Sequence, residues 1–431
     1  MKVLVIGAAL SGCAVAKLCA AKGMEVTLTD KKEIPEKEAL EALGIQVYPE
    51  GHPDHLKEVK WDMIVKNPGI PDYVPFVSYF KEKGYFLYNE LEVAQSFANY
   101  RYGAVTGTNG KTTTVTILKE LLKTLDERND GVGNIGLPLS DLVLHYGREP
   151  LSMAVEISAF QLLGVKNFHP EVSVCTNLTP DHLDVFGDLD NYYKTKMLVY
   201  ANQKDDDWFL LNLDDENCVK YAKDVPCKVV TYSLYQDADL CLKDGIVYLF
   251  GKELFPTQIL RIPGMHNVSN AMVAAAMAYK MGVSKDSIFN VLSNFAGVEH
   301  RIQFVRELDG VRYYNDSKGT NPDSTIVALK AFNKPVILLG GGYDKHTGFE
   351  SIKPYRERIK HLVAFGATKH QLQEIVPDAI LVEDLAEAVD RAHKLAEDGD
   401  IVLLSPMCAS WDQFPNFEVR GHEFVRLVQE L

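Results

Sequence analysis

A short glycine-rich segment has the residue types and spacing of a phosphate-binding loop: Gly107-Thr108-Asn109-Gly110-Lys111-Thr112-Thr113. An apolar run at 102–105 precedes it and a segment with helical character at 115–125 follows it, which predicts a strand, a tight turn and a helix N-terminus. Backbone N–H groups in such a turn, and at the start of a helix, attract the phosphates of ATP. In this arrangement Lys111 neutralises the outer phosphates and the hydroxyl group of Thr112 binds Mg²⁺.

The loop is shorter than the common G-x-x-x-x-G-K-[ST] pattern, because Val105 stands where the first glycine should be. The pattern that remains, G-T-x-G-K-T-T, favours one class of ATP-dependent ligases over nucleoside triphosphatases in general. The alternative is a plain turn that happens to contain a lysine. The apolar run before the loop and the helical segment after it favour phosphate binding.

Three further residues in the middle of the chain could take part in the same chemistry. Glu156 follows the apolar run 153–155, so it ends a predicted strand, where its carboxylate would face the phosphate loop and suit Mg²⁺ if the two strands are neighbours. His182 follows a strand end and a Pro turn, and from the residues alone a ligand role and a structural role both remain open. Lys196 lies in a helical pattern and, taken alone, is a solvated helix lysine.

The N-terminal segment 7–12 resembles a dinucleotide-binding turn, but Ala9 replaces the middle glycine that lets the backbone approach a pyrophosphate. Asp30 ends the second predicted strand, where an acid could bind a ribose hydroxyl, and two lysines follow it. An NAD site is therefore weakly supported. A site for another nucleotide and a turn needed only for packing are equally compatible with this pattern.

Near the C-terminus, Lys345 follows the segment Gly340-Gly341-Gly342-Tyr343-Asp344 at a predicted strand end. A glycine-rich loop that places one cation there suits a dicarboxylic substrate. A solvent-exposed lysine on a glycine-rich loop is the alternative.

Strands alternate with helices along the whole chain, which predicts α/β domains with parallel sheets and ligands at the carboxyl ends of the strands. We expect domains at 1–97, 98–297 and 298–431. The predicted strands are 3–6, 25–29, 63–65, 102–105, 153–157, 172–177, 208–213, 335–339, 361–365, 379–382 and 401–404. Helices are expected at 11–22, 115–125 and 385–395.

Composition narrows the class of protein. The 431 residues carry 45 Lys and Arg against 59 Asp and Glu, a net charge of −14, which disfavours nucleic-acid binding over a broad surface. The seven cysteines form no C-x-x-C pair and are expected to be reduced. The sequence shows no signal peptide and no apolar run long enough for membrane insertion, so we expect a cytoplasmic protein. We also expect it to act as a monomer.

Nine motifs together resemble the Mur ligase family, and they span nearly the whole chain in the expected order. They are G-T-N-G-K-T-T, G-N-I-G (133–136), E-I-S-A-F-Q (156–161), N-L-T-P-D-H-L-D (177–184), Y-x-x-x-K (192–196), G-M-H-N-V-S-N (264–270), H-R (300–301), D-S-K-G-T-N (316–321) and L-S-P-M-C-A-S (404–410). The resemblance implies a Rossmann-like N-terminal domain for a UDP-linked precursor, a central P-loop ATPase domain, and a Rossmann-like C-terminal domain for the incoming amino acid.

The resemblance also implies roles for individual residues. Lys196 is carbamylated in the family, which turns a cation into an anion. The implied metal ligands for Mg²⁺ are Thr112, Glu156, His182 and carbamylated Lys196, and the implied catalytic residues are Lys111, Glu156, His182 and Lys196. The implied ATP-binding residues are Gly107, Thr108, Asn109, Gly110, Lys111, Thr112, Thr113, Asn267, Asn270, Arg301 and Asp316. The implied precursor-binding residues are Leu10, Ser11, Asp30, Lys31, Lys32, Asn67, Asn134, Ser158 and Gln161. The implied amino-acid-binding residues are Lys318, Thr320, Lys345, Ser410 and Phe417.

Within the family, the chain resembles the members that add D-glutamate to UDP-N-acetylmuramoyl-L-alanine through an acyl phosphate in peptidoglycan precursor synthesis. The D-N-P-R segment typical of members that add L-lysine or diaminopimelate is absent from the sequence, and so is the G-x-G-x-x-G of the L-alanine-adding members. Folylpolyglutamate synthase shares only the central domain. A non-catalytic protein that uses ATP to switch its shape would be expected to have lost the four implied catalytic residues, all of which are present. The base that deprotonates the amine is not assigned.

Overall fold

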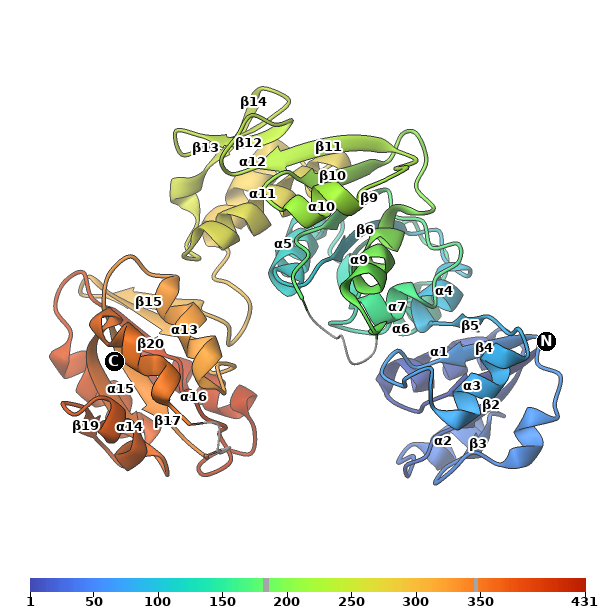
Figure 1. The fold of residues 1–431 in the computed structure, drawn as a ribbon, viewed down its shortest axis with the longest axis horizontal. Coiled ribbons are helices and arrows are strands. Elements are labelled where there is room, and N and C mark those ends of the chain that lie inside the picture. Colours follow the sequence, from blue (N-terminus) through green and yellow to red (C-terminus); the bar gives the residue numbers. More distant parts are fainter. Residues whose placement is uncertain (181–185, 345–347) are drawn as a thin grey trace. The chain divides into compact units, whose positions relative to one another are not determined.

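The computed structural model describes residues 1–180, 186–344 and 348–431 of the chain. These residues form three β-sheets in chain order with helices packed around them (Figure 1), so the predicted three-domain α/β fold is confirmed. They divide into two compact units: a first unit, Met1–Thr257 with Ser269–Val291, and a second unit, Gln258–Val268 with Leu292–Leu431. The first two sheets belong to the first unit and the third sheet to the second. The domain boundaries expected at 97/98 and 297/298 stay predictions.

The first sheet has five parallel strands in the order β3-β2-β1-β4-β5. Four of the five residues of β1 are buried, as is usual for a strand of a parallel sheet that helices cover on both faces. The predicted strands and the predicted helix of this region are confirmed to within one residue. The elements are β1 (Lys2–Ile6), α1 (Leu10–Ala21), β2 (Glu25–Thr29), α2 (Lys37–Ala42), β3 (Gln46–Tyr48), β4 (Met63–Lys66), α3 (Pro75–Glu82), β5 (Leu87–Tyr88) and α4 (Glu90–Gln95).

The second sheet has nine strands in the order β14-β13-β12-β11-β10-β9-β6-β8-β7. Strand β6 lies between β8 and β9 and runs parallel to both, so the loops that follow these three strands meet at one edge of the sheet. The strands are β6 (Arg101–Thr106), β7 (Asp130–Gly133), β8 (Ser152–Glu156), β9 (Val172–Cys175), β10 (Trp208–Asn212), β11 (Lys228–Ser233), β12 (Leu240–Lys243), β13 (Ile246–Leu249) and β14 (Lys252–Pro256). The helices are α5 (Lys111–Lys123), α6 (Leu139–Tyr146), α7 (Ala159–Leu162), α9 (Leu189–Met197), α10 (Glu216–Tyr221), α11 (Met265–Lys280) and α12 (Lys285–Asn294).

The third sheet has six strands in the order β15-β16-β20-β17-β18-β19. Its central strands β16, β20 and β17 run parallel, so the loops after them also meet at one edge. The predicted strand 401–404 and the predicted helix 385–395 begin and end where the structure has β20 and α15. The elements are β15 (Gln303–Leu308), β16 (Val311–Asn315), α13 (Pro322–Lys330), β17 (Val336–Gly341), β18 (Ile359–Phe365), α14 (Lys369–Ile375), β19 (Ile380–Leu381), α15 (Leu385–Leu395), β20 (Ile401–Leu404) and α16 (Phe417–Glu430).

The expectation of purely parallel sheets is wrong at two sheet edges, where hairpins add antiparallel strands. Asp244-Gly245 joins β12 to β13 and Asp309-Gly310 joins β15 to β16, and all four residues have positive φ, between 49° and 76°. Two-residue turns of this kind match the twist of an antiparallel pair, and Asp-Gly is a common sequence for them. The signal was therefore present in the sequence.

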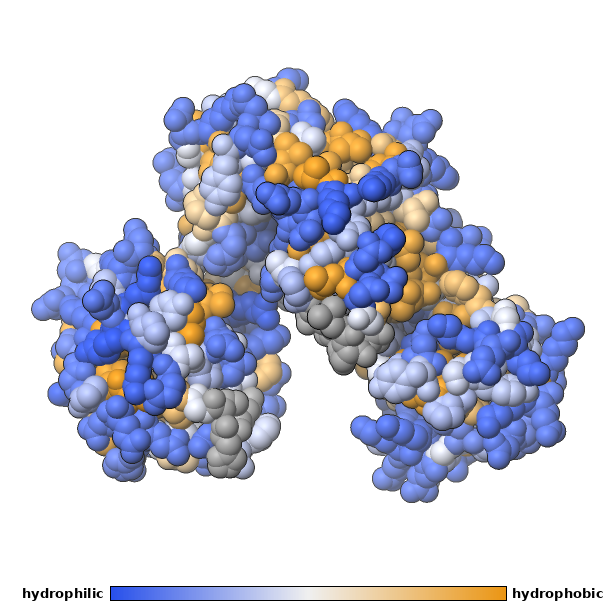
Figure 2. Space-filling model, viewed as in Figure 1, coloured by the Kyte–Doolittle hydropathy of each residue, from blue (hydrophilic) through white to orange (hydrophobic). Residues whose placement is uncertain are grey.

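Hydrophilic side chains predominate on the face shown in Figure 2, with smaller apolar areas between them. Many of the apolar side chains that project from the sheets are buried, for example those along β1, β6 and β17. Within the described ranges, no helix has the length and apolar character needed to cross a membrane.

Candidate functional site

The predicted phosphate-binding loop joins β6 to α5, as expected from its sequence. At Gly107, where φ is +131°, a Cβ atom would lie 2.0 Å from the hydroxyl oxygen of Thr176, so only glycine fits. At Gly110 a Cβ atom would lie 2.5 Å from the side-chain oxygen of Asn270. The first N–H groups of a helix have no partner within the helix, and Gly110 has no side chain to cap those of α5. These N–H groups can therefore donate to a phosphate.

The segment after β9 holds this loop in place. The backbone N–H of Asn109 donates to Oδ1 of Asn177 at 2.9 Å, and Nδ2 of Asn177 donates to the carbonyl oxygen of Asn109 at 3.0 Å. The hydroxyl of Thr176 donates to the same carbonyl oxygen at 2.6 Å. The backbone N–H of Thr108 donates to the carbonyl oxygen of Asn177 at 3.0 Å. Sequence reasoning missed this role of Asn177, because the role exists only once β6 and β9 pair.

Glu156 ends β8, which pairs with β6, so the two strands are neighbours as the prediction required. Its side chain is 2% exposed. Oε1 accepts a hydrogen bond from Nδ2 of Asn134 at 2.9 Å, whereas Oε2 is buried and has no hydrogen-bond partner among the described residues. A buried carboxylate oxygen without a partner is a suitable ligand for Mg²⁺, so this residue fits the implied metal.

Lys111 and Lys196 donate to the same backbone oxygen. Nζ of Lys111 lies 2.8 Å from the carbonyl oxygens of both Gly107 and Thr108. Nζ of Lys196, on α9, also lies 2.8 Å from the carbonyl oxygen of Gly107. Lys196 is 2% exposed, and its Nζ lies over the ring of Tyr192, 4.7 Å from the ring centre. The interpretation of Lys196 as a solvated helix lysine is therefore wrong.

Several other predicted residues of the ATP and metal sites lie on α5 and α11. Thr112 and Thr113 lie in the first turn of α5, and Asn270 accepts a hydrogen bond from the hydroxyl of Thr114 at 3.3 Å, beside the phosphate loop. Asn267 is one turn earlier on α11, and its Nδ2 donates to the carbonyl oxygen of Pro263 at 2.7 Å. His182, a predicted metal ligand, and Lys345, predicted to bind the amino acid, lie outside the described residues, so their roles stay predictions.

The N-terminal turn is shaped by Asp30 and Asn67. Oδ2 of Asp30 accepts the backbone N–H of Ala8 at 2.7 Å, and Oδ1 accepts the backbone N–H of Lys32 at 2.9 Å. Nδ2 of Asn67 donates to the hydroxyl oxygen of Ser11 at 3.1 Å. The predicted precursor residues from the ends of three strands thus lie at one edge of the first sheet, with three exposed side chains: Leu10, Lys31 and Lys32.

Ser158 and Gln161, also predicted to bind the precursor, form a capping box at the start of α7. The backbone N–H of Ser158 donates to Oε1 of Gln161 at 3.0 Å, and the backbone N–H of Gln161 donates to the hydroxyl oxygen of Ser158 at 3.3 Å. Gln161 is buried. In this structure their polar atoms serve the helix start.

In the second unit, Asp316 follows β16 and is buried. Oδ2 accepts a hydrogen bond from the hydroxyl of Ser405 at 2.7 Å, and Oδ1 accepts the backbone N–H of Ile302 at 3.2 Å. Burial raises the pKa of Asp316 to about 7, although these two hydrogen bonds and the charge of Arg301 act in the opposite direction. Both oxygens of this predicted ATP residue therefore already have partners within the unit.

The predicted amino-acid residues lie around the loops after β16 and β20. Ser410 is 2% exposed, and its hydroxyl oxygen has no hydrogen-bond partner in the described part of the chain. Lys318 is exposed, and its Nζ lies 5.7 Å from the ring centre of Phe417 at the start of α16. Thr320 is partly buried, and its backbone N–H donates to the carbonyl oxygen of Lys318. Arg301, predicted to meet ATP, is exposed.

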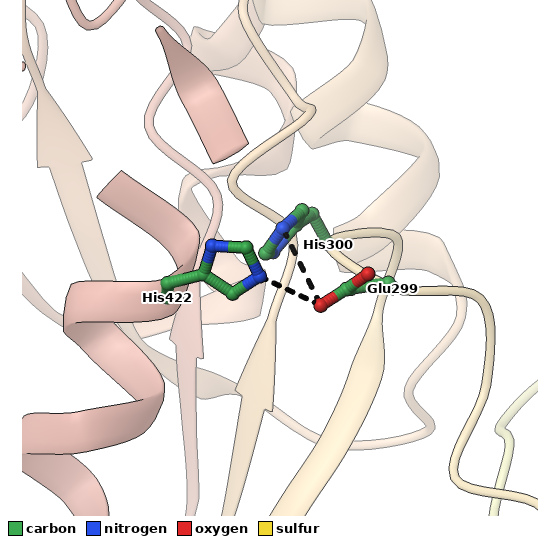
Figure 3. Close-up of side chains that lie close together, drawn as sticks. All are labelled: Glu299, His300 and His422. Atoms are coloured by element: carbon green, nitrogen blue, oxygen red, sulfur yellow. Dashed lines mark hydrogen bonds and ion pairs between the residues drawn. The ribbon is translucent and has the colours of Figure 1, made fainter. Parts of the chain in front are cut away.

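A cluster of Glu299, His300 and His422 lies outside the predicted sites (Figure 3). Oε1 of Glu299 lies 2.8 Å from Nε2 of His422 and 3.9 Å from Nε2 of His300. Nδ2 of Asn315 lies 3.0 Å from Nδ1 of His300, and an amide nitrogen can only donate, so neutral His300 carries its proton on Nε2. A metal would need that nitrogen unprotonated, so this tautomer disfavours a metal site.

Comparison with known proteins settles the family. Residues 105–278 match the model of the Mur ligase middle domain, and residues 300–408 match that of the Mur ligase, glutamate ligase domain. A protein of Ligilactobacillus salivarius, named UDP-N-acetylmuramoylalanine--D-glutamate ligase, is 40% identical, covering 100% of this chain and 96% of its own length. The chain belongs to the Mur ligase family. A relative of the same name from Alkaliphilus metalliredigens is 37% identical, with coverage of 100% and 98%.

Solved structures place this Mur ligase in the same fold class. The UDP-N-acetylmuramate-alanine ligase of Thermotoga maritima aligns with a TM-score of 0.57 at 20% identity, covering 100% of this chain and 99% of the other. A UDP-N-acetylmuramoyl-L-alanyl-D-glutamate--2,6-diaminopimelate ligase aligns with a TM-score of 0.60 at 18% identity, covering 95% and 94%. At these identities the likeness concerns the fold.

Proposed function

We propose that this Mur ligase joins D-glutamate to UDP-N-acetylmuramoyl-L-alanine, with conversion of ATP to ADP and phosphate, in the cytoplasmic synthesis of peptidoglycan precursor. The observation that carries the proposal is the identity of 37–40% along the whole chain with relatives that bear this name. The phosphate loop supports the use of ATP. We further propose that the protein acts as a monomer.

In the first step, a carboxylate oxygen of the precursor attacks the γ-phosphorus of ATP, the bond to the ADP oxygen breaks, and an acyl phosphate forms. Negative charge spreads over the transferred group, so fixed positive groups lower the barrier. Lys111 and the uncapped N-terminus of α5 supply positive charge at the loop. We assign ATP binding to the loop 107–113 and to Asn267, Asn270, Arg301 and Asp316.

The oxygen Oε2 of Glu156 supports a site for Mg²⁺, because it is buried without a hydrogen-bond partner in the part of the chain that the structure describes. We assign metal binding to Thr112, Glu156, His182 and Lys196. Bound Mg²⁺ supplies charge neutralisation on the phosphates. Asn134 orients the carboxylate of Glu156 through its 2.9 Å hydrogen bond to Oε1.

Lys196 can be such a ligand only as a carbamate, since an ammonium group has no lone pair. The structure supports the modification through charge. The ammonium groups of Lys111 and Lys196 share one carbonyl oxygen of Gly107, and two cations so close repel each other. Carbamylation of Lys196 replaces this repulsion with attraction between an anion and the cation of Lys111.

In the second step, the amine of D-glutamate attacks the acyl carbon and phosphate leaves. The amine must first lose a proton, and no base is assigned. We assign D-glutamate binding to Lys318, Thr320, Lys345, Ser410 and Phe417. The hydroxyl group of Ser410, buried and without a partner among the described residues, supports a polar ligand there. We assign the precursor to Leu10, Ser11, Asp30, Lys31, Lys32, Asn67, Asn134, Ser158 and Gln161.

The proposal is tested by phosphate release in the presence of ATP, Mg²⁺ and UDP-N-acetylmuramoyl-L-alanine, with one amino acid added at a time. We expect release with D-glutamate and background release with L-glutamate, L-alanine and L-lysine. Release with another amino acid alone would keep the ligase chemistry and contradict the choice of D-glutamate.

A further inference from the structure

Among the described residues of the second unit, one arginine lies in the interior. The side chain of Arg420, on α16, is 0% exposed, and within the described residues no carboxylate forms an ion pair with it. Burial lowers its pKa to about 10, which leaves the guanidinium charged at neutral pH. A buried cation is costly, so all of its donors need partners. Those partners show what the residue does.

The guanidinium group of Arg420 joins two loops that are far apart in the sequence. Nε donates to the hydroxyl oxygen of Ser317 at 3.0 Å, and Nη2 donates to the carbonyl oxygen of Ser317 at 2.9 Å. Nη1 and Nη2 both donate to the carbonyl oxygen of Cys408 at 3.2 Å. Ser317 follows β16 and Cys408 follows β20, so one side chain fixes the spacing of these two strand-end loops.

The loop after β17 also packs against this group. A Cβ atom on Gly342 would lie 3.2 Å from Nη1 of Arg420. The guanidinium group therefore bonds to the loops after β16 and β20 and leaves little room for a side chain at Gly342, after β17. A lysine cannot replace it, because a single ammonium group cannot reach acceptors on two loops in the fixed planar geometry of a guanidinium.

A second layer of hydrogen bonds extends the same arrangement. The hydroxyl of Ser317 donates to the carbonyl oxygen of Phe417 at 2.8 Å, and the backbone N–H of Ser317 donates to Oδ1 of Asn315 at 3.1 Å. Nδ2 of Asn315 contacts Nδ1 of His300, and the carbonyl oxygen of His300 accepts the backbone N–H of Lys318 at 3.0 Å. The backbone N–H of Lys318 is thereby fixed to the segment that contains His300.

We propose that Arg420 is the positioning residue of the amino-acid site. This inference rests on the proposed function, because the residues that Arg420 holds in place are those assigned to D-glutamate. Ser317 precedes Lys318, Cys408 lies two residues before Ser410, and Phe417 is bonded through Ser317. Arg420 touches no substrate in this account. It sets the distance between Lys318 on one loop and Ser410 on the other, which must match a dicarboxylic amino acid.

The charge of Arg420 adds to this effect. The acids whose charges act on it, Asp316 and Asp412, form no ion pair with it in the described structure. A positive charge that is not neutralised at close range favours an anion at the strand ends nearby. A substrate with two carboxylates therefore fits the potential as well as the spacing.

The test compares Arg420→Lys with the matched control Arg426→Met, which lies on the same helix, is exposed, and pairs with Glu423 and Glu430. The measured quantities are kcat and the KM values for D-glutamate and for UDP-N-acetylmuramoyl-L-alanine. For Arg420→Lys we expect the KM for D-glutamate to rise about 10- to 100-fold, with the precursor KM changed less than about two-fold. Arg426→Met should leave all three values as in the wild type.

A merely structural role gives a different result. Partial unfolding lowers the fraction of active enzyme, so kcat falls while both KM values stay the same. That outcome, or wild-type kinetics for Arg420→Lys, overturns the proposal. If Arg420→Lys does not fold, Ser317→Ala removes one acceptor of the guanidinium and should raise the D-glutamate KM about 3- to 10-fold, and an unchanged KM there overturns it. Failure of the proposed function itself appears earlier, as wild-type enzyme that does not respond to D-glutamate.

Discussion

The phosphate loop of the first unit and the strand-end loops of the second unit obtain a fixed geometry in different ways. The phosphate loop is one short segment, held mainly through its backbone by the residues that follow β9. The loops of the second unit come from three strands and are held by buried side chains, above all Arg420. Phosphate recognition by backbone groups leaves a local sequence motif, whereas recognition of an amino acid depends on side chains that meet only in the fold.

The largest effect is expected for Lys196→Ala at the phosphate loop. If Lys196 acts as a carbamate, its removal deletes both a metal ligand and the anion beside Lys111, so turnover should fall about 1,000-fold. Short carboxylates such as acetate should restore part of the activity by occupying the vacated space. The matched control is Lys194→Ala on the same helix, whose exposed side chain pairs with Asp190. Steady-state phosphate release measures the activity of Lys196→Ala, its recovery with short carboxylates, and the activity of Lys194→Ala. Wild-type activity of Lys196→Ala would contradict a role of Lys196 in the mechanism.

A smaller loss is expected for Glu156→Gln. The substitution keeps the oxygen that accepts from Asn134, but it removes the negative charge at the buried Oε2. We expect kcat to fall about 100-fold and the concentration of Mg²⁺ needed for half-maximal activity to rise. The measurement is a Mg²⁺ titration of phosphate release. A Mg²⁺ dependence identical to that of the wild type would contradict the assignment of Glu156 as a ligand.

Asn177→Ala tests the same comparison by disturbing the phosphate loop of the first unit. Losing two hydrogen bonds to Asn109 should loosen the phosphate loop and raise the KM for ATP about 10-fold, with the KM for D-glutamate unchanged. For Arg420→Lys, in contrast, we expect the KM for D-glutamate to rise. Asn202→Ala, which loses a bond to the carbonyl oxygen of Phe168 in the same unit, is the control. A rise in the KM for D-glutamate alone would show that the two sites are not held independently.

The sequence predicted the fold and the strand, loop and helix around residues 107–113 well, because both leave local patterns. Alternating strands and helices, the G-T-N-G-K-T-T segment and the strand end at Glu156 all depend on neighbours within about ten residues. It did not predict the clamp formed by Asn177, the burial of Lys196 or the position of Arg420. Each of these depends on contacts across 68 to 103 residues, which no local pattern contains. The two Asp-Gly hairpins are different, since their signal was local.

The smallest effect concerns stability and pH. Burial raises the pKa of Glu90 in the first unit and of Asp316 in the second to about 7. The folded protein holds these protons more tightly than the unfolded chain does, so both groups favour folding at low pH and this contribution is lost as pH rises to about 7.

Glu90→Gln cannot ionise, so we expect its free energy of unfolding to depend less on pH than that of the wild type between pH 5 and 7. The difference should not exceed about 3 kcal/mol. Urea unfolding at several pH values measures it, with the exposed Glu418→Gln as control. An unchanged pH dependence in Glu90→Gln would show that this carboxyl group ionises at the same pH in the folded and the unfolded protein.

The central claim is that D-glutamate receives an acyl group activated by ATP. The most direct test uses UDP-N-acetylmuramoyl-L-alanine with ¹⁸O in the carboxylate of its alanine. If that carboxylate attacks the γ-phosphorus and the amine then attacks the acyl carbon, the released phosphate keeps one ¹⁸O. We therefore expect phosphate with a single ¹⁸O, formed only when D-glutamate is present. Unlabelled phosphate, or labelled phosphate formed equally with L-glutamate, would contradict the account.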